Sequence, residues 1–216
     1  MNKKKNKLQE ISQKIKDCQK CSLFRTANKS VPGEGSPKAK ILFIGEAPGY
    51  YEDQQGRPFV GRAGKLLDSC LEEIGLSRKE VFIANILKHR PPDNRDPLPD
   101  EITACRKWLD KQVEIINPEV IATLGRFSMN KFLPGVFISQ THGQAHFANF
   151  NKKKYLIFPL YHPAAALRNG NILQELKKDF AKLKELVDNK EKLEMLQQFE
   201  KEEKPEKEEK EQLKLL

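Results

Sequence analysis

Three carboxylates and the ring of a phenylalanine lie within a short glycine-rich stretch, residues 45–61. The carboxylates are Glu46, Glu52 and Asp53, and the ring belongs to Phe59. Glycine lets main-chain groups come close to a ligand. An apolar run of four residues precedes the stretch, so these groups are expected at the carboxyl end of a parallel strand, where open α/β sheets bind their ligands. The stretch therefore indicates a ligand-binding site.

The glycine spacing of residues 56–63 imitates a phosphate-binding loop but lacks its chemistry. A P-loop needs Lys and then Ser or Thr at the positions that hold Arg62 and Ala63 here. No hydroxyl is left to bind magnesium, which excludes a nucleoside triphosphatase of this type.

Four residues suggest a metal site. Cys18 and Cys21 have the C-x-x-C spacing with which two thiolates hold one metal centre. His89 and Cys105 can join them in a Cys3His set, which suits zinc or an iron–sulfur cluster, and the residues alone leave a site without metal equally open. Cys70 lies in an apolar helical segment, where a buried structural thiol is the better interpretation.

Two polar residues stand at the ends of expected strands. Asn85 interrupts an apolar run, so its amide is either bonded to a neighbouring loop or free to read the edge of a base. His162 precedes a proline where a strand meets a helix, a position that suits either a structural histidine or one aimed into a crevice.

Strands and helices alternate along the chain, which predicts a right-handed βαβ sheet covered on both faces. Residues 88–99 contain four prolines and are expected to be irregular, and residues 136–147 are interpreted as an irregular hairpin. The expected strands are residues 41–44, 81–87, 119–124 and 155–160, and the expected helices are residues 3–17, 62–74, 100–116, 126–132, 164–169 and 172–187.

The formal net charge of the 216 residues is +9. Residues 189–216 hold seven Lys and nine Glu, which leaves 32 basic and 21 acidic residues, a balance of +11, in residues 1–188. This surplus fits a polyanionic partner, although solubility alone would also explain it. We expect one domain over residues 1–188, with the N-terminal helix and the C-x-x-C segment within residues 1–38. Residues 189–216 are expected to form a charged extension, helical or disordered.

The composition also bears on location. No segment approaches the length of a membrane-spanning helix, and no apolar signal core follows the basic N-terminus. Four cysteines are few for a disulfide scaffold, which agrees with a reducing compartment. A cytoplasmic protein without a membrane partner is expected.

Taken together, these residues resemble the family 4 uracil-DNA glycosylases, the iron–sulfur branch of the uracil-DNA glycosylase superfamily. The match runs from about residue 17 to about residue 180. It is carried by Cys18-x-x-Cys21, residues 45–49 with Glu52-Asp53, residues 56–61, Asn85, residues 90–95, residues 98–101, Cys105 and residues 162–165.

The resemblance implies an α/β fold, a three-layer α/β/α sandwich with a central, mostly parallel, four-stranded sheet. It implies a monomeric DNA-repair enzyme whose partner is uracil-containing DNA, single- or double-stranded. Such an enzyme breaks the N-glycosidic bond of a flipped-out nucleotide with the help of water and leaves an abasic site.

By the same resemblance, Phe59 stacks on the flipped uracil, and Asn85 recognises its O4 and N3–H, which disfavours cytosine. The catalytic residues are His162, which donates a hydrogen bond to O2 as negative charge develops there, and Glu46, which directs water or stabilises charge. Glu52 is placed to crowd the C5 edge of the base and reject thymine.

Gly45, Ala47 and Asp53 complete the substrate-binding set that the resemblance implies. Other branches of the superfamily carry Asp or Asn at the position of Ala47 as the water-positioning group. Catalysis here must therefore depend on Glu46, on backbone groups and on the oxocarbenium-like character of the breaking bond.

The resemblance also implies DNA contacts. Arg90 and Arg95 are expected beside the DNA backbone. The segment that holds Leu167 and Arg168 is expected to fill the gap left in the duplex and to touch phosphate.

The family pattern supplies four cysteines to its cluster, and the third belongs where this chain has His89. Imidazole can replace thiolate on iron. A 4Fe-4S cluster held by Cys18, Cys21, His89 and Cys105 is therefore expected, as a staple between the N-terminal segment and residues 88–105. A cluster with one labile iron, a structural zinc and no metal at all are the alternatives.

Two rival functions share this frame. One is a catalytically idle DNA-binding module, against which the joint presence of Glu46, Phe59, Asn85 and His162 argues. The other is a glycosylase for another deaminated base, such as hypoxanthine.

Overall fold

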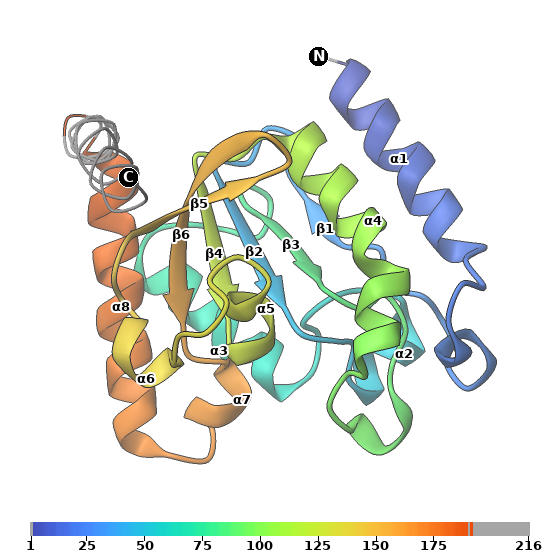
Figure 1. The fold of residues 1–216 in the computed structure, drawn as a ribbon. Coiled ribbons are helices and arrows are strands. Elements are labelled where there is room, and N and C mark those ends of the chain that lie inside the picture. The colour runs from blue at the N-terminus through green and yellow to red at the C-terminus, as the bar shows by residue number, and fades with distance from the viewer. Residues whose placement is uncertain (1, 190, 192–216) are drawn as a thin grey trace, which may run out of the picture.

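A mixed six-stranded sheet forms the centre of the computed structural model, which describes residues 2–189 and 191. The strand order is β1-β3-β2-β4-β6-β5, and the four inner strands are parallel (Figure 1). This inner set confirms the predicted parallel sheet, and an antiparallel strand extends it at each edge. The strands are β1 (Glu34–Gly35), β2 (Ile41–Gly45), β3 (Phe82–Asn85), β4 (Val120–Leu124), β5 (His146–Phe150) and β6 (Lys153–Leu160).

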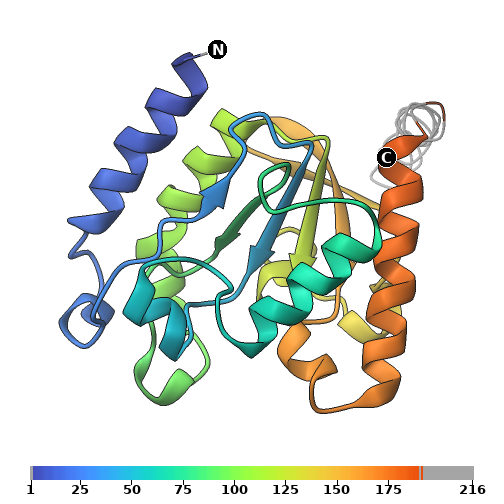
Figure 2. The ribbon, with the colours of Figure 1, turned by 180° about the vertical axis from the view of Figure 1, so that it is seen from behind.

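Helices cover both faces of the sheet and make the three-layer sandwich that the sequence predicts. Figure 2 shows α3 and α8 in front of the sheet, with α1 and α4 behind it. The helices are α1 (Asn2–Lys16), α2 (Tyr50–Gln55), α3 (Arg62–Glu73), α4 (Pro99–Ile116), α5 (Arg126–Asn130), α6 (Ile138–Thr141), α7 (Pro163–Ala166) and α8 (Gly170–Asp188), and 3-10 turns cover Ser22–Arg25 and Pro92–Asn94.

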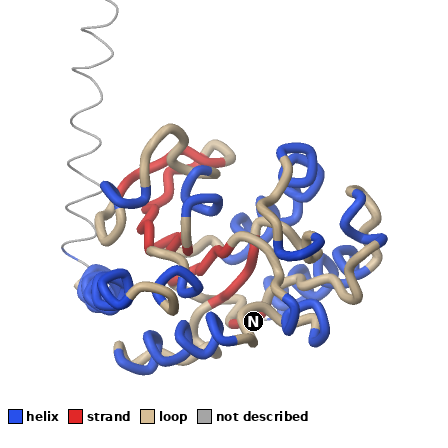
Figure 3. Tube along the Cα trace, turned by 90° about the horizontal axis from the view of Figure 1, so that it is seen from below, coloured by secondary structure: helices blue, strands red, loops and turns tan. Residues whose placement is uncertain are grey.

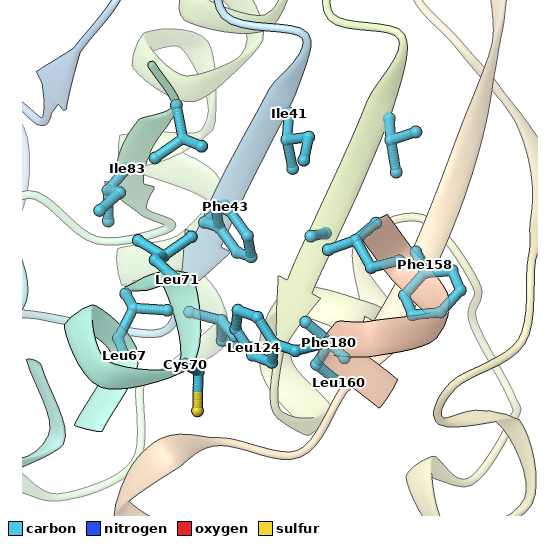
Figure 4. Close-up of a cluster of buried hydrophobic side chains, with 14 of the residues drawn as sticks. Ile41, Phe43, Leu67, Cys70, Leu71, Ile83, Leu124, Phe158, Leu160 and Phe180 are labelled. Carbon is cyan, nitrogen blue, oxygen red and sulfur yellow. The ribbon is translucent and has the colours of Figure 1, made fainter. Parts of the chain in front are cut away.

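Alternate residues of the inner strands fill two separate cores, because successive side chains of a strand point to opposite faces. On one face, Phe43 of β2 stacks on Phe180 of α8, with ring centroids 5.7 Å apart (Figure 4). On the other face, Leu42 and Ile44 pack with Trp108 and its neighbours on α4. Both faces of the inner strands are buried, which explains why these strands read as continuous apolar runs in the sequence.

Apart from the two edge strands, a hairpin and a helix differ from the prediction. The expected hairpin at residues 136–147 is wrong: this part holds α6, and the hairpin forms farther along, between β5 and β6. Its turn consists of Asn151 and Lys152, both with positive φ, and such turns match the twist of paired strands. The second difference is α2, which the sequence analysis did not predict.

The carboxyl ends of the inner strands meet at one edge of the molecule, which Figure 3 shows from below. The loops that carry the chemistry-bearing residues leave from this edge. The extension expected at residues 189–216 lies outside the described residues, apart from Asn189 and Glu191. Among the helices of the described part, none combines the length and the apolar character needed to cross a bilayer.

Candidate active site

A cavity of about 380 Å³ opens at the carboxyl ends of β2 and β3. Its wall includes Glu46, Glu52, Phe59, Asn85 and His162, which come from three separate parts of the sequence. The structure therefore brings together the residues expected to bind and convert a base. Ala47, Arg95 and Arg168 also contribute to the wall.

Gly45, the last residue of β2, leaves room for the two residues that would recognise the base. A Cβ atom at this position would lie 2.6 Å from Cζ of Phe59 and would also collide with the amide oxygen of Asn85. The missing side chain thus lets the ring and the amide pack directly against the end of the strand.

Phe59 is held in a backbone conformation that side chains rarely adopt. Its φ is 52°, its side chain is buried, and its ring centroid lies 5.7 Å from that of His162. Left-handed conformations outside glycine cost free energy and persist where neighbours enforce them. Glu52 is one such neighbour, since its Oε1 accepts hydrogen bonds from the amides of Val60 at 2.8 Å and Gly61 at 2.9 Å.

Arg78 is the second neighbour that fixes Phe59. Its guanidinium donates to the carbonyl oxygen of Phe59 at 2.9 Å and to that of Pro58 at 2.5 Å. The same guanidinium pairs with Glu34 and Asp68, each at 2.8 Å. Two carboxylates thus orient the cation, and the cation orients the two carbonyls next to the ring.

Asn85 presents an unpartnered acceptor at the cavity. The residue is 1% exposed, and its Oδ1 has no hydrogen-bond partner among the described residues. A buried polar atom without a partner is costly, so such an atom at a cavity wall marks a place for a ligand donor. The backbone is fixed by Lys88, fully buried, whose Nζ donates to the Asn85 carbonyl and to Oε1 of Gln112, both at 2.8 Å.

His162 lies at the N-cap of α7, and its Nδ1 accepts a hydrogen bond from the amide of Ala164 at 3.0 Å. Burial lowers the pKa of His162 to about 4, although the carboxylate of Glu52 acts in the opposite direction. The imidazole is therefore neutral near pH 7. Because Nδ1 accepts, the ring proton resides on Nε2, which makes that nitrogen a neutral hydrogen-bond donor.

Glu46 is a carboxylate with an elevated proton affinity. Burial, and to a smaller extent the charge of Asp96, raise its pKa to about 7, while Arg126 acts in the opposite direction. Asp96 and Arg126 form an ion pair with each other. A carboxyl group that titrates near neutral pH is typical of groups that take part in acid–base chemistry.

Asp53, which the resemblance places in the substrate-binding set, is not among the residues of the cavity wall. It is 1% exposed, and its carboxylate accepts hydrogen bonds from the amide of Asn28 at 2.9 Å and from that of Lys29 at 3.3 Å. Neighbouring residues of a helix point about 100° apart, so Asp53 faces this loop while Glu52 faces the cavity. The role of Asp53 is to anchor the loop that follows the C-x-x-C segment.

The residues expected to contact DNA surround the cavity mouth. Arg95 and Arg168 line the cavity, and the guanidinium of Arg95 forms a two-point ion pair with Glu101. Arg90 lies over the ring of Tyr50, and Leu167 is 41% exposed directly before Arg168.

The three thiols of the expected metal site gather near the start of α4. Cys21 and Cys105 are close enough for their charges to interact with each other and with Cys18. Trp108 donates its indole N–H to Sγ of Cys18 at 3.2 Å, and His89 shares a cavity wall with Cys18. Burial raises the pKa of Cys105 to about 11, so a bound cation would be needed to hold its thiolate.

Within the part of the chain that the structure describes, no three His, Cys, Asp or Glu side chains are arranged to hold a single metal ion. A four-iron cluster is larger and holds its thiolates farther apart, and three thiolates with one imidazole have the chemistry that such a cluster accepts.

Sequence reasoning missed four positioning residues: Arg78, Lys88, and the ion-paired Asp96 and Arg126. Arg78 donates to the carbonyl of Phe59, 19 positions away in the sequence, and Lys88 donates to the side chain of Gln112 on α4, 24 positions away. The one available signal was Lys88 itself, a charged residue directly after an apolar strand.

Comparison with known proteins agrees with the geometry. The family model described as the uracil DNA glycosylase superfamily matches residues 32–186. The type-4 uracil-DNA glycosylase of Sulfurisphaera tokodaii is 48% identical over 185 residues, which cover 83% of this chain and 84% of that protein.

Two further relatives carry the same name. That of Archaeoglobus fulgidus is 44% identical over 190 residues, 85% of this chain and 95% of the relative. That of Thermotoga maritima is 43% identical over 159 residues, which cover 74% of this chain and 82% of the relative. The family model and the three relatives together show that the chain belongs to the uracil-DNA glycosylase superfamily and within it to the type-4 group.

Proposed function

We propose that this protein is a uracil-DNA glycosylase, which hydrolyses the N-glycosidic bond of uracil in DNA and leaves an abasic site. The relatives named above are type-4 uracil-DNA glycosylases, and the match with this chain covers most of the length of each. The observation that carries the proposal is the buried, unpartnered Oδ1 of Asn85 in the same cavity as a neutral His162.

Asn85 reads the base by its hydrogen-bonding pattern. Its Oδ1 accepts from N3–H of a flipped-out uracil, and its Nδ2 donates to O4. Cytosine has an acceptor at N3 and a donor at C4, which would leave the buried amide facing two like groups, and such mismatches are strongly disfavoured. The ring of Phe59 stacks on the base, and Glu52 limits space at the C5 edge.

His162 supplies the driving interaction for bond cleavage. As the bond breaks, the leaving uracil gains negative charge on O2, and Nε2–H of a neutral imidazole donates to this oxygen. A donor fixed in a water-poor site can contribute roughly 3 kcal/mol to transition-state stabilisation. Hypoxanthine carries C2–H where uracil carries O2, so this donor would have no acceptor, which favours uracil over that base.

Glu46 acts on the sugar side of the bond. As a carboxylate it stabilises the positive charge that develops on the deoxyribose, or directs water to it. Ala47 offers no side chain that could hold this water. The carboxylate form exists above a pH of about 7.

A uracil-containing oligonucleotide treated with the protein and then with hot alkali tests the proposal. Cleavage at uracil is expected, with little at cytosine, thymine or hypoxanthine placed at the same position. A gel shift without cleavage would support an idle DNA-binding module instead, and cleavage at hypoxanthine alone would redirect the substrate assignment.

We also propose that Cys18, Cys21, His89 and Cys105 hold a 4Fe-4S cluster, which staples the N-terminal segment to the start of α4. Bound there, the cluster supplies structural cross-linking and not chemistry at the base. The support is the gathering of the three thiols, with Trp108 as a hydrogen-bond donor to one of them.

Iron, zinc and sulfide analysis of anaerobically purified protein, with a visible spectrum, tests the cluster. About four irons per chain are expected, together with an altered spectrum in a His89→Cys variant. An unchanged spectrum in that variant would exclude His89 as a ligand, and zinc without iron would exclude the cluster.

A further inference from the structure

Two aromatic side chains stand exposed beside the active-site cavity. Tyr50 is 54% exposed and Tyr51 is 56% exposed, and both belong to the first turn of α2. Their rings meet edge to face, with centroids 5.4 Å apart. Large aromatic rings that remain in water at the rim of a binding site favour a partner that covers them.

The pair bridges the two loops that form the rim. On one side, the guanidinium of Arg90 lies 5.4 Å from the ring centroid of Tyr50, and Nε of Arg90 donates to Oδ1 of Asn94, a residue of the cavity wall. On the other side, the ring of Tyr51 lies so close to Gly61 that a Cβ there would be 3.3 Å from it. The rings therefore have defined positions next to the mouth.

The surrounding charge selects the kind of partner. Arg90 holds its cation directly over Tyr50, and residues 1–188 carry a surplus of eleven positive charges. Exposed aromatic rings flanked by arginine are the combination with which proteins bind unpaired bases and the phosphates between them. A nucleotide chain whose uracil is seated in the cavity must pass over this rim.

We propose that Tyr50 and Tyr51 form a stacking platform for an unpaired base adjacent to the excised uracil on the same DNA strand. This inference rests on the proposed function. The platform is blind to base identity because every base has a π-face, and it favours substrates whose neighbouring base is free to unstack. The enzyme should therefore process uracil in single strands, mismatches and frayed ends faster than uracil within stable duplex.

Kinetics on oligonucleotides with a single uracil test the platform. Tyr50→Ala and Tyr51→Ala are each expected to lower kcat/KM on single-stranded substrate about tenfold, chiefly through KM. Tyr50→Phe should retain wild-type values, because the ring is what stacks. Two further substrates carry an abasic tetrahydrofuran spacer in place of the base next to uracil, one on its 5′ side and the other on its 3′ side. On the substrate whose spacer replaces the stacked base, wild type and the Tyr→Ala variants should have equal kcat/KM; on the other, the difference should remain.

Phe137, 70% exposed directly before α6, provides a matched control, because α6 lies across the molecule from α2 (Figures 1 and 2). Phe137→Ala should leave the kinetics unchanged. The salt dependence of binding should be the same in wild type and in Tyr→Ala, since no charge is removed. Equal losses in Tyr50→Ala and Phe137→Ala, or a Tyr→Ala loss that persists with both spacers, would overturn the platform. A wild-type protein that leaves uracil in place would instead overturn the proposed function.

Discussion

Replacing Arg78 with methionine should impair catalysis although Arg78 is not part of the cavity wall. The change removes the donors to the carbonyls of Pro58 and Phe59 while keeping an unbranched apolar stem. Hydrogen bonds from a charged donor contribute about 1.5–3 kcal/mol each, whereas the left-handed conformation of Phe59 costs on the order of 1–3 kcal/mol. The free energy of the lost hydrogen bonds is thus comparable with the cost of the left-handed conformation that these bonds maintain. Without them, Phe59 should relax and withdraw its ring from the base.

The expected size follows from the stacking that is lost. A ring stacked on a base contributes roughly 1–3 kcal/mol, which corresponds to a decrease of about 5- to 150-fold in kcat/KM. The assay is single-turnover excision from a uracil oligonucleotide, with thermal unfolding measured alongside to confirm that the variant is folded. Arg57→Met is the matched control, because Arg57 also pairs with Glu34, at 2.8 Å, but its hydrogen bonds go to that carboxylate and to neither carbonyl.

A double-mutant cycle separates positioning from general destabilisation. If Arg78 acts through Phe59, then Arg78→Met should have little further effect on excision in a Phe59→Ala background, while its effect on the melting temperature persists. Additive losses in excision, or full activity of Arg78→Met, would refute the reasoning.

Two further predictions concern the titrating groups. The value of kcat/KM should rise with pH through an apparent pKa near 7, as Glu46 becomes a carboxylate, and Glu46→Gln should abolish this rise; a profile unchanged by the substitution would assign the titration elsewhere. The folded-state pKa of Glu46 lies above its ordinary value of 4.5, so its contribution to stability is present below pH 4.5 and is lost as the pH rises through 7. The melting temperature of Glu46→Gln minus that of wild type should therefore be larger at pH 8 than at pH 4.5. His162→Gln should lower kcat about 100-fold with a smaller change in KM, since the lost donor acts on charge formed in the transition state. No limb of the wild-type profile should arise from His162 above pH 5, because its pKa is about 4; a limb that disappears in His162→Gln would contradict the neutral-imidazole assignment.

The sequence predicts the inner sheet and most of the site because both depend on local patterns. The inner strands are apolar runs, and the catalytic positions follow them directly, as Glu46 follows β2. The edge strands escape prediction for the opposite reason: β1 has two residues, and β5 is mostly half-buried rather than a continuous buried apolar run. Pairing with a neighbour, rather than their own composition, makes these segments strands.

Side-chain direction and long-range clamps are the parts of the site that the sequence does not contain. Glu52 and Asp53 are adjacent and chemically alike, and only the helix α2, which was not predicted, separates their roles. The positive φ of Phe59 depends on Arg78, and a contact across 19 residues has no local signature.

Lys88 has a consequence for how the chain assembles. Its ammonium is enclosed completely, and the two oxygens to which it donates, the Asn85 carbonyl and Oε1 of Gln112, belong to β3 and α4. A buried cation that loses an acceptor destabilises the fold by several kcal/mol, far more than the same cation with all its acceptors stabilises it. If α4 docked one turn out of place, Gln112 would move away and the charge would be stranded in an apolar interior. Misassembled forms are thus electrostatically destabilised, and the amide of Asn85, to which we assign recognition of the base, is held in place only in molecules whose α4 is correctly aligned.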